Sequence, residues 1–271
     1  MKSWKVPEND LTTVQKVTLR RLLTHQAGIN RPDGGIGFTP GRVPTLVQVL
    51  KGAEPAENKP AVVESVPGSK WAYSNFDFLV IQLLIEEAVG KPFAQAAREM
   101  VFQPLDMTSS TLSHPVDATL RRRTIVPHDE NGRAHDRPMH PTALAQGGLL
   151  TTPSDLGRLA IELMRATQGQ SNRVLSRKTV LAMTKQEVAL DPNQFGGFVS
   201  GQGLGTFLMG QGQNLAFLHP GSNVPGATCL LIGFPALGKG AIIMTNAAGG
   251  ELLMAQLALT IQREYRWPLG Q

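Results

Sequence analysis

The sequence predicts an α+β fold in which a mostly helical region precedes an antiparallel sheet and a closing helix. Apolar residues recur at helical spacing in several segments before residue 200. After about residue 203, short β-like runs alternate with Gly, Pro and Asn, and the amphipathic segment "GELLMAQLALTIQREY" follows them. We therefore expect one domain over residues 1–271, with a mainly helical region over residues 17–200 and an antiparallel sheet with its helix over residues 203–271.

The composition is that of a globular protein with a substantial core. The chain has 271 residues, of which 41% are hydrophobic and 17% are charged. Its formal net charge is +5, but the basic residues are dispersed, and the one tight cluster, Arg121-Arg122-Arg123, has no interleaved aromatic residues. A solvated loop face explains that cluster better than a nucleic-acid site, so we expect no nucleic-acid partner.

The sequence pattern does not indicate a membrane protein. No apolar run approaches the ~20 residues of a membrane helix, and the N-terminal segment lacks the apolar stretch of a signal peptide. We expect no membrane partner and a cytoplasmic location for the chain as given, whereas a longer parent protein would also be compatible with the periplasm. The one cysteine, Cys229, lies in the strand-like run "ATCLLIGF", which favours a buried, inert thiol.

The first part of the chain has one helical pattern and a long loop. The segment "TLRRLLTHQAG" has helical spacing through Leu19, Leu22 and Leu23, and Gly28 is the expected helix stop. Residues 30–68 are rich in Gly and Pro and are expected to be mainly loop, apart from one short apolar stretch, "VPTLVQVLKG".

Two longer helices follow. The segment "NFDFLVIQLLIEEAVG" has a strong helical pattern that Gly90 closes, and "KPFAQAAREMVFQPL" begins another helix directly after it. Further on, Thr152 is an expected N-cap, and Pro153 suits the first helical position of "TTPSDLGRLAIELMRA".

The last part of the chain predicts a β-meander. Four short runs have strand character and are separated by turn residues: "GLGTFLMG", "NLAFLHP", "ATCLLIGF" and "GAIIMTN". The glycines around the first run lack the strand, turn and helix context of a dinucleotide fingerprint, so hairpin turns explain them better. We expect no cofactor.

A polar segment between residues 108 and 145 contains most of the histidines. A metal site there would draw on His114, His128, Asp129, His135, Asp136 and His140. No tight pair of ligands at helical or hairpin spacing supports such a site. We therefore interpret these histidines as surface residues and expect no metal.

Five ordered blocks of the sequence resemble a known family. They are "VTLRRLLTHQAGI", "PGSKWAYSNFDFLVIQLLIEEAVGKPFAQAAREMVFQPLDM", "QGGLLTTPSDLGRL", "HPGSNVPGATCLLIGFP" and "IIMTN". In this order they resemble the serine β-lactamase and penicillin-binding-protein superfamily, and most closely the class C-like β-lactamases and the related carboxylesterases. The resemblance runs from about Val17 to the C-terminus and implies a β-lactamase/transpeptidase-like fold.

The resemblance also implies a set of site residues. The family has three motifs, which are S-x-x-K, Y-x-N and a K-T-G-type strand. Tyr73-Ser74-Asn75 matches the second motif, so Tyr73 would take the proton of the nucleophilic serine and Asn75 would bind the substrate or the catalytic lysine. His219 stands in the third motif, followed by Gly221 and by Ser222, whose backbone N–H would be an oxyanion donor.

Each of these assignments has a structural alternative. Tyr73 can also be a half-buried aromatic residue next to a helix start, and His219 can be a strand-end histidine satisfied by hydrogen bonds. A tyrosine acts as a base only if a nearby cation lowers its pKa below about 10.

The K-T-G lysine is a permanent cation suited to a carboxylate, whereas a histidine is only partly charged at neutral pH. The third motif therefore favours neutral esters or amides over efficient β-lactam hydrolysis.

The first motif is missing from the 271 residues, because no S-x-x-K occurs in them. The nearest imitation is Thr13-Val14-Gln15-Lys16, which chance explains. The hydroxyls of Ser69, Ser74 and Ser222 have no evident base beside them. By resemblance, the missing segment would precede "LLTHQAG", so we expect the chain to be N-terminally incomplete, either as a fragment or as a truncated relative. A truncated relative would cover its exposed sheet edge by self-association.

Two classes of function follow. The first is a serine hydrolase that acts on small-molecule esters, amides or β-lactams through an acyl-enzyme, with its nucleophile outside these residues. The second is a catalytically inactive binding or scaffolding domain with the same fold. We expect the 271-residue chain alone to be inactive.

Overall fold

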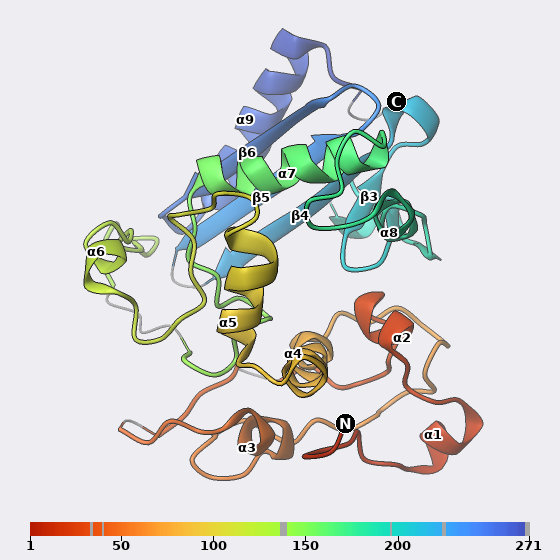
Figure 1. Ribbon diagram of the computed structural model, residues 1–271, viewed down its shortest axis with the longest axis vertical. Coiled ribbons are helices and arrows are strands. Elements are labelled where there is room, and N and C mark those ends of the chain that lie inside the picture. Colours follow the sequence, from red (N-terminus) through yellow and green to blue (C-terminus); the bar gives the residue numbers. More distant parts are fainter. Residues whose placement is uncertain (33–34, 40, 136–139, 196, 224–225, 269–271) are drawn as a thin grey trace. The chain divides into compact units, whose positions relative to one another are not determined.

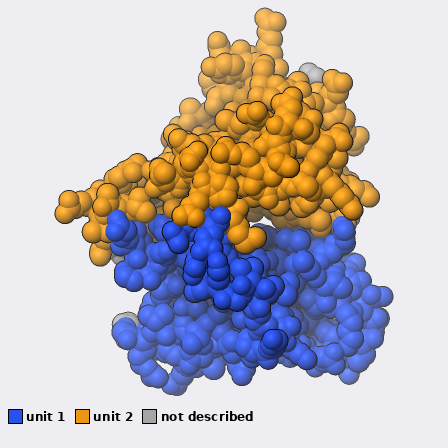
Figure 2. All heavy atoms as spheres, viewed as in Figure 1, with its two compact units in different colours: residues 1–99, 111–117, 139–149 blue, residues 100–110, 118–138, 150–271 orange. Residues whose placement is uncertain are grey.

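The computed structural model describes residues 1–32, 35–39, 41–135, 140–195, 197–223 and 226–268. The chain divides into two compact units (Figure 2). Unit 1 comprises residues 1–99, 111–117 and 139–149, and unit 2 comprises residues 100–110, 118–138 and 150–271. Each unit is described by itself. The single domain with a division near residue 200 stays a prediction.

Unit 1 is built around one long helix, α4 (Asn75–Val89), which contacts α2, α3 and α5 (Figure 1). The shorter helices are α1 (Asp10–Val14), α2 (Leu19–Leu23), α3 (Leu46–Lys51) and α5 (Phe93–Ala97). Apolar side chains from α2, α3 and α4 form the core of this unit: Leu22, Val49, Leu50, Phe76, Leu79 and Val80. Removing these side chains from water is the main force that holds α4 in place.

Both ends of α4 agree with the prediction from its sequence. Ser74 is the N-cap, and its hydroxyl accepts the N–H of Phe76 at 3.2 Å. Gly90 follows the last helical residue with a φ of 69°, a left-handed conformation that a glycine adopts without a Cβ penalty. The helix predicted over "NFDFLVIQLLIEEAVG" is confirmed.

The helix in "TLRRLLTHQAG" ends earlier than the sequence predicts. α2 stops at Leu23 with Thr24 as its C-cap, because the next residue, His25, has a φ of 53° and turns the chain away. Gly28 is therefore not a helix stop. It has a φ of 75°, and a Cβ at this position would lie 2.2 Å from the carbonyl oxygen of Ser65, so glycine is required for this close approach.

One helix lies where the sequence analysis expects mainly loop. The apolar stretch "VPTLVQVLKG" forms α3, which begins with a capping box. The Thr45 hydroxyl accepts the N–H of Gln48 at 3.2 Å, and the Gln48 side chain accepts the N–H of Thr45 at 2.8 Å. The T-x-x-Q spacing that predicts such a box is present in the sequence.

Unit 2 contains the sheet. Its strands are β1 (Val188–Ala189), β2 (Gly201–Gln202), β3 (Phe207–Met209), β4 (Ala216–Asn223), β5 (Ala227–Phe234) and β6 (Lys239–Thr245). They pair in chain order, and every pair is antiparallel. The predicted meander is confirmed, and the α+β class of a β-lactamase/transpeptidase-like fold with it.

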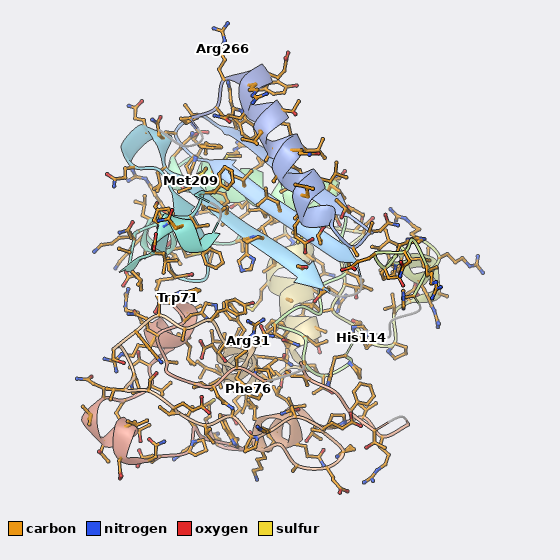
Figure 3. The ribbon with its side chains drawn as sticks, turned by 180° about the vertical axis from the view of Figure 1, so that it is seen from behind. Arg31, Trp71, Phe76, His114, Met209 and Arg266 are labelled. Atoms are coloured by element: carbon orange, nitrogen blue, oxygen red, sulfur yellow. The ribbon has the colours of Figure 1, made fainter. Side chains whose placement is uncertain are left out.

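Two helices cover opposite faces of this sheet, as Figures 1 and 3 show from opposite sides. They are α7 (Pro153–Thr167) and α9 (Gly250–Tyr265), and both contact β5 and β6. The Thr152 hydroxyl caps α7 by accepting the N–H of Asp155 at 3.2 Å, as its sequence predicts. The remaining helices are α6 (Ala118–Arg121), α8 (Arg177–Met183), the π-helix η1 (Arg98–Phe102) and the 3₁₀-helices η2 (Pro192–Phe195) and η3 (Gly212–Asn214).

The core of unit 2 lies between α7 and the sheet. It contains Leu163, Met164, Ala166, Val180, Leu208 and Phe217. Within the described ranges, the helices all fall short of the length and apolar character that crossing a membrane requires.

We expect Gly28→Ala to lower the free energy of unfolding by more than Gly90→Ala does. Both positions have a positive φ, where a Cβ costs about 1–2 kcal/mol. At Gly28 the new Cβ also meets the Ser65 carbonyl oxygen, whereas at Gly90 no atom lies within 4 Å. Urea unfolding of both variants measures the difference, and equal losses would contradict the role of the Ser65 contact.

Candidate functional site

The predicted site residues lie in two different units. Tyr73 and Asn75 belong to unit 1, and His219, Gly221 and Ser222 belong to unit 2. The convergence of the two halves of the site in one cleft stays a prediction.

Tyr73 directly precedes the N-cap of α4 and is half-buried. Its ring lies 4.5 Å from the ring of His25, centroid to centroid, and the guanidinium of Arg31 lies 5.5 Å from its centroid. Burial raises the pKa of the Tyr73 phenol, and the Asp77 carboxyl raises it further, while the Arg31 guanidinium lowers it. Because burial is the largest of these effects, the phenol stays protonated in this arrangement.

The next two residues begin α4. Ser74 is fully buried, and its hydroxyl donates to the Asn30 carbonyl at 2.6 Å while it accepts the N–H of Phe76. This side chain therefore joins a loop to a helix start and is not a nucleophile. Asn75 is half-buried and is the first residue of α4.

Two buried ionisable residues that the sequence analysis did not select lie next to Tyr73. His25 and Asp77 are 3% and 1% exposed, and the His25 Nδ1 lies 2.9 Å from the Asp77 Oδ2. Burial lowers the pKa of His25 to about 4, so its imidazole is neutral at neutral pH, and burial also raises the pKa of Asp77 well above its usual value. A carboxyl within the apolar pattern of α4 is the signal that identifies Asp77 from the sequence.

In unit 2, His219 lies on an exposed part of β4. The β3 ladder ends at the pair Phe207–Leu218, so β4 continues past β3 from His219 onward. Pro220 has no backbone N–H to donate, which suits the part of β4 that extends beyond β3. The His219 Nδ1–H donates to the Pro220 carbonyl at 2.9 Å, and its ring contacts the ring of Phe207 at 5.8 Å.

Gly221 faces Cys229 across the β4–β5 ladder. A Cβ at Gly221 would lie 2.8 Å from the Cys229 Sγ, so the cysteine side chain occupies the space that glycine leaves open. Cys229 is half-buried rather than buried as expected, and burial raises the pKa of its thiol, which agrees with an inert thiol.

The Ser222 hydroxyl donates to the Glu251 carboxylate at the start of α9, and this hydrogen bond lowers the pKa of Glu251. The hydroxyl is therefore committed to a structural contact. The candidate role of Ser222 rests on its backbone N–H alone.

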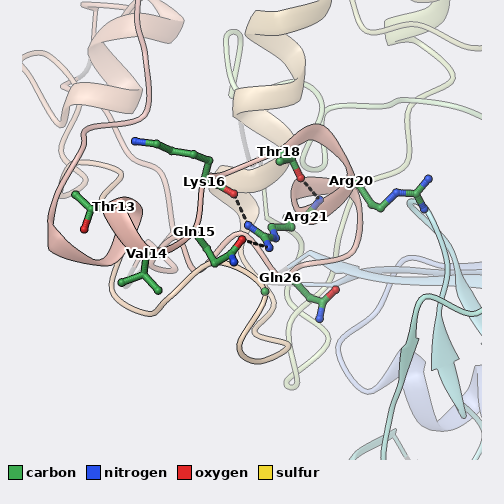
Figure 4. Close-up of a pocket in the computed structure, with 9 residues that line it drawn as sticks. Thr13, Val14, Gln15, Lys16, Thr18, Arg20, Arg21 and Gln26 are labelled. Carbon is green, nitrogen blue, oxygen red and sulfur yellow. Dashed lines mark hydrogen bonds between the residues drawn. The ribbon is translucent and has the colours of Figure 1, made fainter.

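The imitation of the first motif does not form a catalytic pair. Thr13 and Lys16 border a hollow of about 590 Å³ in unit 1, which Figure 4 shows together with Arg20, Arg21 and Gln26. The Thr13 hydroxyl donates to the Asp10 carbonyl at 2.6 Å, and the Lys16 Nζ donates to Glu8 at 2.7 Å. Each polar group has its own partner, which agrees with a chance match.

The histidines of the polar segment do not form a metal site in the described part of the chain. His135 pairs with Asp129 at 2.9 Å, and the part of the chain that the structure describes has no group of three His, Cys, Asp or Glu residues able to hold an ion. Asp136 lies outside the described residues. His114, His128 and His140 are half-buried rather than exposed, and burial lowers the pKa of His114 and of His140, to about 4 for His140. The expectation of surface histidines is wrong for these three.

Comparison with known proteins identifies the family. The beta-lactamase family matches residues 6–263, which is nearly the whole chain. This chain belongs to the beta-lactamase family. The predicted resemblance to the serine β-lactamase and penicillin-binding-protein superfamily is confirmed, and the family is one of hydrolases.

Curated relatives and solved structures give the same result. The D-alanyl-D-alanine-carboxypeptidase/endopeptidase AmpH of Escherichia coli (strain K12) is 34% identical over 146 residues, which cover 52% of this chain and 35% of AmpH. The chain thus spans about a third of the length of the curated relatives it matches. A D-amino acid amidase from Ochrobactrum anthropi SV3 superposes with a TM-score of 0.68 at 22% identity, covering 88% of this chain and 66% of the amidase.

An octameric penicillin-binding protein homologue from Pyrococcus abyssi has a TM-score of 0.67 at 21% identity, covering 96% of this chain and 60% of the homologue. At this identity, the amidase and the homologue show the shared fold alone.

The ionisation of Tyr73 can be measured directly, because the chain has only two tyrosines. In a Tyr265→Phe variant the tyrosinate absorbance reports Tyr73 alone. We expect its titration midpoint above 10, the usual value for a tyrosine, because burial disfavours the phenolate. Ultraviolet titration of the folded variant checks this, and a midpoint below the usual value would mean that the Arg31 guanidinium outweighs burial.

We expect Gly221→Ala to destabilise the β4–β5 ladder by about 1–3 kcal/mol through overpacking against Cys229. Removing the thiol in Gly221→Ala/Cys229→Ala should restore part of the loss, because the space then accepts the new methyl group. The coupling free energy from a double-mutant cycle by urea unfolding measures this. Additive effects of the two substitutions would show that the Cys229 contact does not explain the glycine.

Proposed function

We propose that this protein is a serine hydrolase that acts on small esters or amides through an acyl-enzyme. Tyr73 is the proton-transferring residue, Asn75 binds the substrate or a catalytic lysine, and His219, Gly221 and Ser222 form the strand beside the substrate. The observation that carries the proposal is the arrangement of Tyr73 and Asn75 on either side of the buried cap of α4, in a chain of the beta-lactamase family. The nucleophile belongs to an S-x-x-K segment outside these 271 residues.

The chemistry of Tyr73 supports the need for that segment. A serine hydroxyl attacks only after a base removes its proton, and a protonated phenol is not a base. Among the described residues, Arg31 is the cation that lowers the pKa of Tyr73, and its effect is smaller than that of burial. The lysine of an S-x-x-K motif would add a second positive charge and move the pKa of the phenol downward.

The geometry of His219 supports neutral substrates. Its Nδ1–H is engaged by the Pro220 carbonyl, and the position lacks the permanent charge that a lysine would present to a carboxylate. Esters and amides without an anionic group near the reacting carbonyl do not need that charge.

A second function is favoured by one observation. The 271 residues contain no S-x-x-K, and the Thr13 and Lys16 side chains that imitate it contact other partners. A binding or scaffolding domain with this fold would keep the site residues Tyr73, Asn75 and His219 and would need no nucleophile. In that case self-association is the proposed partner interaction, since β6 ends the sheet and Leu252, Leu253 and Leu257 on α9 are exposed.

A fluorophosphonate serine probe separates the two functions. We expect no labelling of the 271-residue chain, because it contains no S-x-x-K serine. A form extended to include an S-x-x-K segment should be labelled and should hydrolyse aryl esters. In that form, Tyr73→Phe should slow acylation by roughly 10²–10⁴-fold, the usual contribution of a general base.

The control for this substitution is Tyr265→Phe, which removes the other tyrosine, exposed at the end of α9, and should leave the rate unchanged. Stoichiometric labelling of the 271-residue chain would show that its nucleophile lies within these residues. No labelling of the extended form would favour the binding domain.

A further inference from the structure

His25 holds the chain on both sides of Tyr73. The N–H of Ala72 donates to the His25 carbonyl at 2.8 Å, and the N–H of Ser74 lies 3.3 Å from the His25 Nδ1. Between these two contacts, the Tyr73 ring packs on the imidazole with a centroid distance of 4.5 Å and an angle of 43° between the planes. One residue therefore contacts the tyrosine ring and both neighbouring peptide groups.

The conformation of His25 is itself fixed from two directions. Its backbone has a φ of 53°, a left-handed conformation in which histidine, asparagine and aspartate occur more often than other residues with a Cβ. Its ring is fixed by the Asp77 carboxyl, which comes from the first turn of α4. The ring of Phe78 also lies near the imidazole, at a centroid distance of 5.4 Å.

A purely apolar core would not need this pair. Burying two ionisable groups is unfavourable, and the Asp77 Oδ1 has no hydrogen-bond partner in the described part of the chain. A buried hydrogen-bonded pair such as His25 and Asp77 can fix the orientation of a side chain, whereas an apolar side chain only fills space. Here the oriented group is the imidazole on which Tyr73 lies.

We propose that His25 is a positioning residue for Tyr73, and that Asp77 holds its imidazole in the orientation that supports the tyrosine ring. The proposal rests on the proposed function, in which Tyr73 transfers the proton. His25 and Asp77 act on the substrate only through Tyr73. Among the described residues, the charged or titratable groups that face Tyr73 are His25, Asp77 and Arg31.

The test replaces the ring and keeps the backbone. His25→Asn retains the tolerance for a positive φ and a side-chain oxygen that can accept the Ser74 N–H, but it removes the surface on which Tyr73 packs. With Tyr265→Phe as the background, the NMR signal of ring-labelled tyrosine comes from Tyr73 alone. We expect His25→Asn to move this signal and to lower the titration midpoint of Tyr73 toward about 10, the value of an exposed phenol.

Asp77→Asn provides a second variant with the helix and the side-chain volume preserved. It removes a carboxyl that raises the pKa of Tyr73 and weakens the hold on the imidazole, so the midpoint should fall here as well. If His25→Asn does not fold, this variant decides the question with the same two measurements.

Val80→Ala is the matched control. Val80 is 1% exposed in the core around the same helix, so its truncation lowers the stability of unit 1 while both His25 and Asp77 are kept. The Tyr73 signal and midpoint should not change in this variant. The proposal is overturned if His25→Asn and Asp77→Asn leave both measurements unchanged, or if Val80→Ala moves them equally.

These measurements do not require turnover. A failure of the extended form to react with the serine probe would overturn the proposed function and leave the contact between His25 and Tyr73 standing. A failure of the tyrosine measurements would overturn the role of His25 and leave the hydrolase proposal standing.

Discussion

The burial of helix α4 is the constraint on which unit 1 depends. Its apolar side chains form the core of unit 1 together with those of α2 and α3, and its N-terminus is buried as well. A buried helix start leaves N–H groups that water cannot reach, and each must find a partner in the protein. Ser74 supplies a partner for one of these groups, because its hydroxyl accepts the N–H of Phe76. The same hydroxyl donates to the Asn30 carbonyl in the preceding loop. Tyr73 and Asn75 adjoin this cap, so the same contacts that stabilise the helix also fix both candidate site residues.

Regular elements with strong local signals could be predicted from the sequence. The helix of residues 75–89, its glycine stop, the cap at Thr152 and the four predicted strand runs all follow from patterns that neighbouring residues determine. Elements that depend on distant contacts could not. β1 and β2 have two residues each, too few for an alternating pattern, and they exist because the adjacent strands offer hydrogen bonds. α2 ends before Gly28 because His25 turns the chain to meet Asp77.

The residues of the candidate site also fall into two groups, those that the sequence could identify and those that only the structure shows. Tyr73, Asn75, His219, Gly221 and Ser222 could be selected because they stand in motifs. His25 and Asp77 are separated by 52 residues, and neither motif nor spacing joins them. The requirement for glycine at position 221 also becomes clear only in three dimensions, because it comes from a sulfur atom on the next strand. Sequence patterns identify residues by type and order, whereas the environment that sets a pKa or leaves room for a side chain depends on packing.

The two units are interleaved along the chain, and this has a consequence for how the protein can change in evolution. The boundaries between them fall after residues 99, 110, 117, 138 and 149, so neither unit corresponds to one continuous stretch of sequence. A recombination event that moves one contiguous piece of the gene therefore cannot carry the whole of either unit without parts of the other. Neither unit can be exchanged whole, as one contiguous module, between related genes.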